Sequence, residues 1–165
     1  MPRISSATCA SVPDIVDRET RSRMMSGIRG KDTRPEKIIR SGLHARGLRY
    51  RLHDKTLPGR PDLVFPKYGA VIFVHGCFWH GHDCHLFKWP QSNLQKWLEK
   101  IEANRRRDGE VIDRLLDDGI RVLVIWECAL KGKTRLEPTA LISQAEDWLK
   151  KGSNEYHIIC GEESA

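Results

Sequence analysis

The sequence lacks a long hydrophobic run. Among its 165 residues, no apolar stretch approaches the roughly 20 residues that a membrane-spanning helix needs. The N-terminus also lacks the apolar core of a secretory signal peptide, so we expect a soluble, cytoplasmic protein with no membrane partner. A chain of this length suggests one domain, large enough to bury a hydrophobic core without disulfide support.

The sequence also lacks the even cysteine count of a disulfide framework. An odd number in an intracellular setting argues against paired cysteines and favours metal ligation. The five cysteines are Cys9, Cys77, Cys84, Cys128 and Cys160.

A net excess of positive charge is absent from most of the chain. Between Arg21 and Arg60 there are 12 Lys and Arg against 3 Asp and Glu, whereas the rest has 16 against 19. A basic block of this kind attracts phosphodiester backbones. The charge alone leaves open an exposed basic helix face with no partner.

Composition predicts three segments. Residues 1–16 are rich in Ser, Ala and Pro, as in a disordered leader. Residues 17–31 predict a mobile basic arm, because Gly27 and Gly30 interrupt a short helix. Residues 32–160 are expected to form a single domain.

The hydrophobic pattern predicts an α/β fold with a mixed central sheet flanked by helices. We expect Asp32 or Thr33 to cap the first helix of the domain and Asn93 to cap the second, which Gly109 should weaken. A hairpin is expected at residues 66–69. The predicted helices are 32–47, 93–118 and 137–150, and the predicted strands are 48–53, two within 62–76, a buried strand at 120–127 and a weaker one at 156–160.

The segment "HGCFWHGHDCH" concentrates four histidines and two cysteines. Cys77, His82 and Cys84 could supply three ligands of a tetrahedral Zn²⁺ site. Cys128 follows a buried strand and is the expected fourth ligand, with His85 as its rival. Four protein ligands would make the zinc structural, not catalytic. The alternative is that the cysteines are ordinary buried thiols.

A second group of polar residues surrounds the motif "GRPDLVF". Asp62 lies where a strand begins, Glu36 lies on the preceding helix, and His75 and His80 follow the next strand. Carboxylates are the ligands that Mg²⁺ prefers, and a neutral imidazole can accept a proton from water. Beside a basic surface, this set suggests phosphodiester hydrolysis, although Asp62 alone could be an ordinary strand-end carboxylate.

Four blocks in this order give the chain a specific resemblance to the very short patch repair endonucleases of bacteria. They are "TRSRMM", "LPGRPDLVF", "VIFVHGCFWHGHDC" and "VLVIWECAL", and the similarity runs from about residue 17 to residue 149. The resemblance implies a restriction-endonuclease-like core. It further implies nicking of double-stranded DNA on the 5′ side of the thymine in a T:G mismatch, which arises when 5-methylcytosine is deaminated.

The resemblance also assigns the chemistry. Asp62 becomes the Mg²⁺ ligand, assisted by the backbone carbonyl of Val74. His80 becomes the general base, Glu36 a supporting acid, and His75 a neighbour of the scissile phosphate. The family's structural Zn²⁺ ligands match Cys77, His82, Cys84 and Cys128.

The DNA contacts follow in the same way. Phe78, Trp79 and Trp97 are expected to enter the duplex from the major groove, and Met25 from the minor groove. Stacked aromatic side chains can wedge between base pairs most easily at a mismatch. Basic residues are assigned to phosphates, with Arg60 as an addition to the three in the arm: Arg21, Arg23, Arg29 and Arg60. Phe78 and Trp79 could instead be core residues, as we expect for Trp126 and Trp148.

Two departures from related patterns stand out. The general nuclease fold places an acid and a lysine on the strand after the first Asp, whereas this strand carries Phe73 and His75. A histidine-based mechanism is therefore required. The repair family has a denser histidine run and a Thr before the first His, whereas this chain has Gly81, Asp83 and Val74.

Two other functions remain open on the sequence alone. One is a zinc-stabilised DNA-binding module without catalysis, and the other is a restriction-type or RNA nuclease without mismatch specificity. We expect a monomer, associated with the bacterial nucleoid, whose product passes to a DNA polymerase and to mismatch-repair proteins.

Overall fold

The computed structural model describes residues 17–28, 30–152 and 154–162. The chain divides into two compact units, Met1–Gly30 and Lys31–Ala165, and each is described by itself. The predicted leader, residues 1–16, and Arg29 lie outside the described residues.

In its described residues, 17–28 and 30, the first unit contains the helix α1 (Arg18–Ser26), which has no buried residue. Asp17 caps it, because its carboxylate accepts a hydrogen bond from the Thr20 amide at 2.7 Å. The helix ends at Gly27, where the sequence predicted an interruption.

The second unit is built on a five-stranded mixed sheet in the order β1-β2-β3-β4-β5. β1 and β2 are antiparallel, as are β2 and β3, whereas β3, β4 and β5 run parallel. The predicted mixed sheet is therefore confirmed. The strands are β1 (Arg51–Leu52), β2 (Leu63–Phe65), β3 (Ala70–His75), β4 (Arg121–Trp126) and β5 (Tyr156–Ile159).

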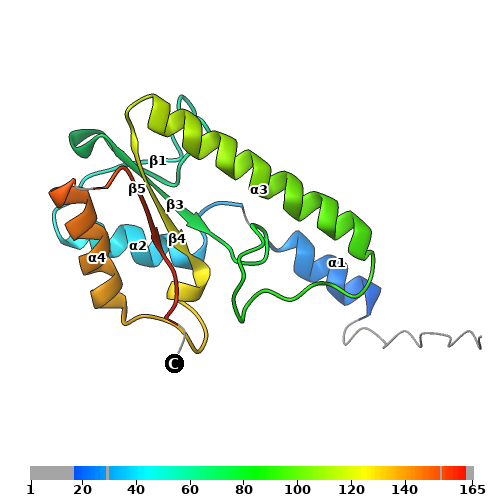
Figure 1. Cartoon of the computed structure of the whole chain (residues 1–165). Helices are drawn as coiled ribbons and strands as arrows, with labels where there is room; N and C mark the ends of the chain where they lie inside the picture. The colour runs from blue at the N-terminus through cyan, green and yellow to red at the C-terminus, as the bar shows by residue number, and fades with distance from the viewer. Residues whose placement is uncertain (1–16, 29, 153, 163–165) are drawn as a thin grey trace, which may run out of the picture. The chain divides into compact units, whose positions relative to one another are not determined.

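Three helices cover the two faces of this sheet, as Figure 1 shows. α2 (Arg34–Ala45) and α4 (Pro138–Lys151) pack on one face, and their buried side chains form the larger core with those of alternate strand residues. α3 (Leu94–Asp117) lies on the other face over a smaller core that includes Phe73 and Leu115. The α/β fold with flanking helices follows from the hydrophobic pattern.

One local expectation about the helices is wrong. Asn93 begins α3, but its φ of 54° is left-handed and its side chain makes no capping hydrogen bond. An N-cap side chain reaches the first amides from an extended backbone, which Asn93 does not have. Gly109 lies inside α3, which runs unbroken for 24 residues, and the weakening expected from this glycine stays a prediction.

The first strand is shorter than expected and the hairpin is as expected. β1 pairs with β2 through only two residues. Pro61 and Pro66 bracket β2 and cannot donate ladder hydrogen bonds, so the ladder stays short. The hairpin turns through a 3₁₀ helix (Pro66–Tyr68) and Gly69, whose φ is 54°.

In the part of the chain that the structure describes, no helix combines the length and the apolar character needed to cross a membrane.

Candidate active site and metal-binding cluster

The parallel strands β3 and β4 bring two distant loops together at one edge of the sheet. β3 ends at His75 and β4 at Trp126, and these two residues are partners in the ladder. Cys77 and Cys128 each lie two residues beyond their strand end. Strand register therefore places the thiols side by side, as expected from the position of Cys128 after a buried strand.

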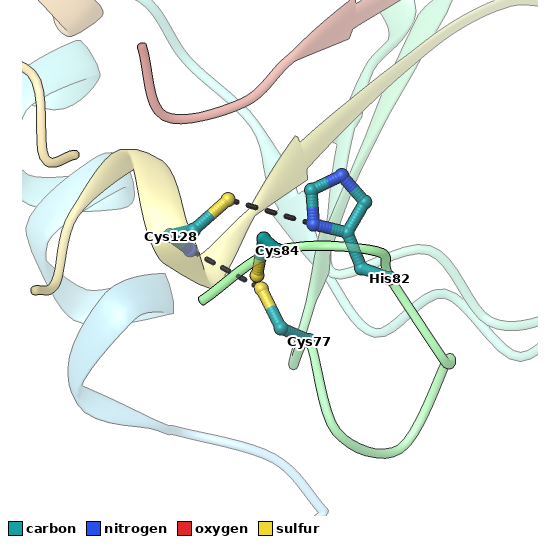
Figure 2. Close-up of side chains that lie close together, drawn as sticks. All are labelled: Cys77, His82, Cys84 and Cys128. Atoms are coloured by element: carbon teal, nitrogen blue, oxygen red, sulfur yellow. Dashed lines mark hydrogen bonds between the residues drawn. The ribbon is translucent and has the colours of Figure 1, made fainter. Parts of the chain in front are cut away.

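Four donor side chains converge there: Cys77, His82, Cys84 and Cys128 (Figure 2). One ligand atom from each lies within 4.8 Å of all the others. The Nδ1 atom of His82 lies 3.6 Å from Sγ of Cys128. Bonds of 2.1 Å to nitrogen and 2.3 Å to sulfur put the donors of a tetrahedral Zn²⁺ about 3.6 Å apart. The donor set and its spacing therefore fit zinc.

Backbone amides support the sulfur atoms of this cluster. The amide of Cys128 donates to Sγ of Cys77, and the amide of Gly161 donates to Sγ of Cys128, each at 3.3 Å. Burial raises the pKa of both thiols when no metal is bound, and binding a metal would require their deprotonation. Burial lowers the pKa of His82, which favours the neutral imidazole that metals bind.

His85, the rival ligand, does not belong to this cluster. Its Nδ1 atom lies 3.4 Å from the hydroxyl of Thr134. A Cβ atom at Gly132 would stand 2.2 Å from Nε2 of His85. The ring of His85 therefore packs against the loop after β4, and Cys128 is the fourth donor of the cluster.

Asp62 lies immediately before β2, at the same edge of the sheet as the end of the antiparallel strand β3. Its Oδ2 atom accepts a hydrogen bond from the Val74 amide at 2.7 Å. Burial raises the pKa of Asp62 to about 7, opposed by the Val74 hydrogen bond, with a further increase from Glu36 and a decrease from His80. The structure thus brings the predicted metal-binding pair, Asp62 and Val74, together near Glu36 and His80.

Glu36 is a buried carboxylate held by the start of α2. It forms a capping box with Thr33, whose hydroxyl and amide donate to Oε1 at 2.9 and 3.3 Å. The Asp32 amide donates to Oε2 at 2.9 Å. Of the two expected caps, Thr33 is the one that caps the helix. The same contacts fix Glu36 beside the site.

His75 and His80 stack face to face, with ring centroids 3.9 Å apart and planes within 1°. The Nδ1 atom of His80 contacts Oδ2 of Asp108 on α3 at 2.5 Å. This bond fixes the ring and leaves Nε2 as the other functional nitrogen. Burial, and then the charge of His80, lower the pKa of His75 to about 3. His75 therefore stays neutral and avoids two stacked cations.

A cavity of about 330 Å³ opens on the α3 side of this pair. His75, His80 and Asp108 line one part of it, and Trp126 and Tyr156 line another. Trp126 is half-buried and stacks on His82, with centroids 4.2 Å apart. Trp126 therefore lines the cavity as well as packing against the smaller core. Trp148 is buried in the larger core, as expected.

The predicted DNA-wedge residues form one aromatic group. Phe78 lies 5.3 Å from Trp79 and 5.2 Å from Trp97, measured between ring centroids. All three are partly buried and belong to neither hydrophobic core. Phe87 and the exposed Trp89 extend the group outward. A surface cluster of rings is what a wedge requires.

One basic side chain lies beside these rings, and the basic residues predicted to bind phosphate lie elsewhere or in the first unit. The Nζ atom of Lys100 lies 5.2 Å from the centroid of Trp79 and 5.5 Å from that of Trp97, within the range of cation–π attraction. Arg60 is exposed, with a left-handed φ of 50°. In the first unit, Met25 is exposed, and a guanidinium nitrogen of Arg23 lies 3.8 Å from a carboxylate oxygen of Glu19. Arg21, also predicted to bind phosphate, is on the same helix.

Sequence reasoning missed two residues of this site, Asp108 and His53. Asp108 lies in the charged run "RRRDGE" of α3, where nothing distinguishes it from a solvated carboxylate. His53 lies between Glu36 and Asp62, 3.7 and 3.8 Å from their carboxylate oxygens. The only signal for His53 was its place opposite Asp62 in a short hairpin, and that depends on strand register.

Comparison with known proteins shows the family to which the chain belongs. The family described as DNA mismatch endonuclease Vsr matches residues 13–86. The chain is 47% identical over 149 residues to DNA mismatch endonuclease Vsr of Escherichia coli (strain K12), covering 90% of the chain and 89% of that relative.

Two nicking enzymes are also similar. Type II nicking enzyme V.XorIIP of Xanthomonas oryzae pv. oryzae (strain KACC10331 / KXO85) is 51% identical over 124 residues, 75% of this chain and 91% of the relative. Type II nicking enzyme V.NmeAIP of Neisseria meningitidis serogroup A / serotype 4A (strain DSM 15465 / Z2491) is 46% identical over 120 residues, 73% and 86% respectively.

Proposed function

Because the chain belongs to the DNA mismatch endonuclease Vsr family, we propose that it nicks double-stranded DNA 5′ to the thymine of a T:G mismatch. The product would initiate very short patch repair of deaminated 5-methylcytosine in the bacterial cytoplasm. The observation that carries the proposal is the meeting of Asp62, Val74 and His80 at one sheet edge. This edge lies beside the surface group of aromatic rings formed by Phe78, Trp79 and Trp97.

Asp62 and the Val74 carbonyl are the residues that would hold Mg²⁺ in the proposed site. Oδ2 of Asp62 is oriented by the Val74 amide, and its other oxygen faces His53. The chemistry supplied at this site by a bound ion would be neutralisation of negative charge on the scissile phosphate and stabilisation of the leaving oxygen. A hard oxygen donor set suits Mg²⁺, whereas the sulfur-rich cluster suits Zn²⁺. The two proposed ions therefore have separate roles, catalytic and structural.

His80 is the proposed general base. Its contact with Asp108 fixes the ring and favours a proton on Nδ1, so that Nε2 can accept a proton from water. The neutral His75 ring stacked on it restricts tilting. His75 lies at the end of β3, where we propose that it faces the scissile phosphate. Glu36 supports the site from α2 through its capping contacts.

The proposed Zn²⁺ would fix the loop that carries both the aromatic rings and the general base. Cys77, His82 and Cys84 enclose Phe78, Trp79 and His80 within eight residues. A loop held at three points by one ion can present rigid rings to the base stack and keep the base in place. We propose that Phe78, Trp79 and Trp97 enter from the major groove, and that Met25 enters from the minor groove. Arg21, Arg23, Arg29 and Arg60 are proposed to bind phosphates.

Nicking of an end-labelled T:G duplex under single-turnover conditions tests this function. With Mg²⁺, Asp62→Ala and His80→Ala should each reduce the nicking rate by about 10²-fold or more, as expected for loss of a metal ligand or a general base. Asp113→Asn, an exposed change on α3, should leave the rate unchanged. Full activity of both alanine variants would overturn the mechanism, and no nicking by the wild type would indicate a binding module.

A further inference from the structure

His53 lies where three elements meet at the Asp62 edge of the sheet. Its backbone amide donates to the Asp62 carbonyl at 3.3 Å, so it is the next cross-strand neighbour after the Leu52 and Leu63 pair. Its Nδ1 atom lies 3.8 Å from Oδ1 of Asp62, and Nε2 lies 3.7 Å from Oε2 of Glu36. Both separations exceed a hydrogen bond.

The backbone of His53 is strained. Its φ of 47° is left-handed, and residues with a side chain in such conformations cluster at functional sites. The buried Nε2 atom, which has no hydrogen-bond partner among the described residues, faces Glu36, and Nδ1 faces Asp62. The strained backbone therefore places the ring between two carboxylates, with Nδ1 as the atom available to an ion at Asp62.

Nδ1 of His53 and Oδ1 of Asp62 lie near each other, but not yet at the distance of two ligands of one ion. In an octahedral site with bonds near 2.1 Å, donor atoms lie about 3.0 Å apart when adjacent or about 4.2 Å apart when opposite. The observed 3.8 Å between Nδ1 and Oδ1 lies between these two values. Binding of one ion by both atoms therefore requires a rotation of one side chain that brings the pair closer.

The neighbouring group of Asp32, Glu36 and His53 also has donor atoms within 4.8 Å of one another, but it is less suited to an ion. Asp32 is paired with Arg40 at 2.6 Å. Both oxygens of Glu36 already accept hydrogen bonds from the start of α2. Oδ1 of Asp62 faces His53, whereas Oδ2 accepts the Val74 hydrogen bond. Asp62 is therefore the better partner of His53 in binding an ion.

We propose that the His53 imidazole is a direct ligand of the divalent ion at Asp62, which makes the site a mixed oxygen and nitrogen site. The inference rests on the proposed metal role of Asp62. An imidazole donor favours Mn²⁺ and later transition-metal ions over Mg²⁺, which prefers oxygen. The enzyme would therefore bind Mn²⁺ more tightly than an all-oxygen site would.

Pulsed electron paramagnetic resonance of bound Mn²⁺ tests this ligand directly. The full chain with zinc loaded would be titrated with MnCl₂ without DNA, and ¹⁴N modulation from a coordinated imidazole would be recorded. His53→Asn is the main variant, because Asn tolerates a left-handed backbone. His53→Gln is the second variant. His44→Gln, eight residues beyond Glu36 on α2 and about 12 Å away along the helix, is the matched control.

The expected result is ¹⁴N modulation in the wild type and in His44→Gln, and its loss in both His53 variants. Mn²⁺ affinity should fall about tenfold in these variants, while zinc content is unchanged. Modulation that persists without His53 would mean that another histidine binds the ion and would overturn the inference. Absence of ¹⁴N modulation from bound Mn²⁺ in the wild type would also overturn it. Since no DNA is cut, failure of the proposed nicking leaves this outcome unaffected.

Discussion

Asp62 is a buried carboxylate whose ionisation, without a bound cation, lowers the stability of the folded state. Its folded-state pKa of about 7 exceeds the ordinary value of 3.8 because burial disfavours the charged form. The folded protein therefore binds this proton more tightly than the unfolded chain does. The ionised group destabilises the fold above pH 7, and the penalty disappears below about pH 4, where both states are protonated.

Asp62→Asn should therefore stabilise the protein when no divalent ion is added. The amide keeps an oxygen that can accept the Val74 hydrogen bond and carries no charge. At pH 8 the free energy of unfolding should rise by up to about 4 kcal/mol, and this gain should fall to less than half at pH 5. Urea unfolding at both pH values measures it. Equal destabilisation at both would contradict the assignment of a buried charge.

Asp108 acts on the reaction through His80. Asp108→Asn removes the charge and allows the amide to donate to Nδ1, which would favour the wrong tautomer of His80. The single-turnover nicking rate should fall by about 10²-fold or more, while the dissociation constant for the T:G duplex changes little. Asp113→Asn serves again as the control. A rate within twofold of the wild type would mean that Asp108 does not position the base.

At the scale of the element, the zinc loop is fitted closely to α3. Gly81 has a φ of 62°, and a Cβ atom there would lie 2.5 Å from Cγ2 of Ile101 and 2.6 Å from Nε of Arg105. Arg105 also donates to the Gly81 carbonyl. The glycine at this position therefore permits the close contact between loop and helix.

Gly81→Ala should lower the free energy of unfolding by about 2 kcal/mol or more, because the left-handed backbone and the contacts with α3 both oppose a side chain. Adding Arg105→Ala should recover only the part due to Arg105. Gly109→Ala is the matched control: no atom lies within 4 Å of its added Cβ, and it should stabilise α3 by about 0.5–1 kcal/mol. Thermal unfolding measures all three. A neutral Gly81→Ala would contradict the packing described.

A second prediction for the loop concerns its aromatic side chains. Phe78 and Trp79 lie outside both cores, so replacing both with Ala should leave zinc content and cooperative unfolding intact. The variant should cut T:G and matched duplexes with much less difference in rate, because the rings no longer probe the stack. Nicking rates on the two duplexes and zinc analysis measure this. Loss of zinc or of the folded state would show that the rings are structural.

Most elements of the fold could be predicted because their signals are local. The buried run of β4 and the amphipathic pattern of α2 and α4 appear within a few consecutive residues. Asn93 was misjudged because its backbone conformation, and not its residue type, decides whether it caps. Propensity describes an average environment, and a loop that approaches a helix from an unusual direction can override it.

At the scale of the whole molecule, prediction of the site depended on topology. The convergence of Cys128 with Cys77 was expected because Cys128 follows a buried strand, and the parallel pairing of β3 and β4 that produces it comes from the structure. The contacts of Asp108 and His53 depend on the rotation of α3 and on the register of a two-residue ladder. No local pattern encodes either of these. The sequence therefore yielded the donors in the motif and missed the partners that come from other elements.

The division of the chain also belongs to this scale. α1 carries basic and apolar exposed side chains in the first unit, and the sheet with its three helices forms the second. We propose that residues 17–31 act as an arm and that residues 32–160 form one catalytic domain. Basic residues of both would contact phosphates, so DNA affinity should decrease steeply with added salt.

The most direct test of the account is the rate of nicking of two end-labelled duplexes that differ only by a T:G pair in place of C:G, with Mg²⁺ and with EDTA. The account predicts one nick, 5′ to the mismatched thymine, at a rate at least 10²-fold above that of the matched duplex, and no nick with EDTA. Equal cutting of the two duplexes, or cutting that persists with EDTA, would contradict it.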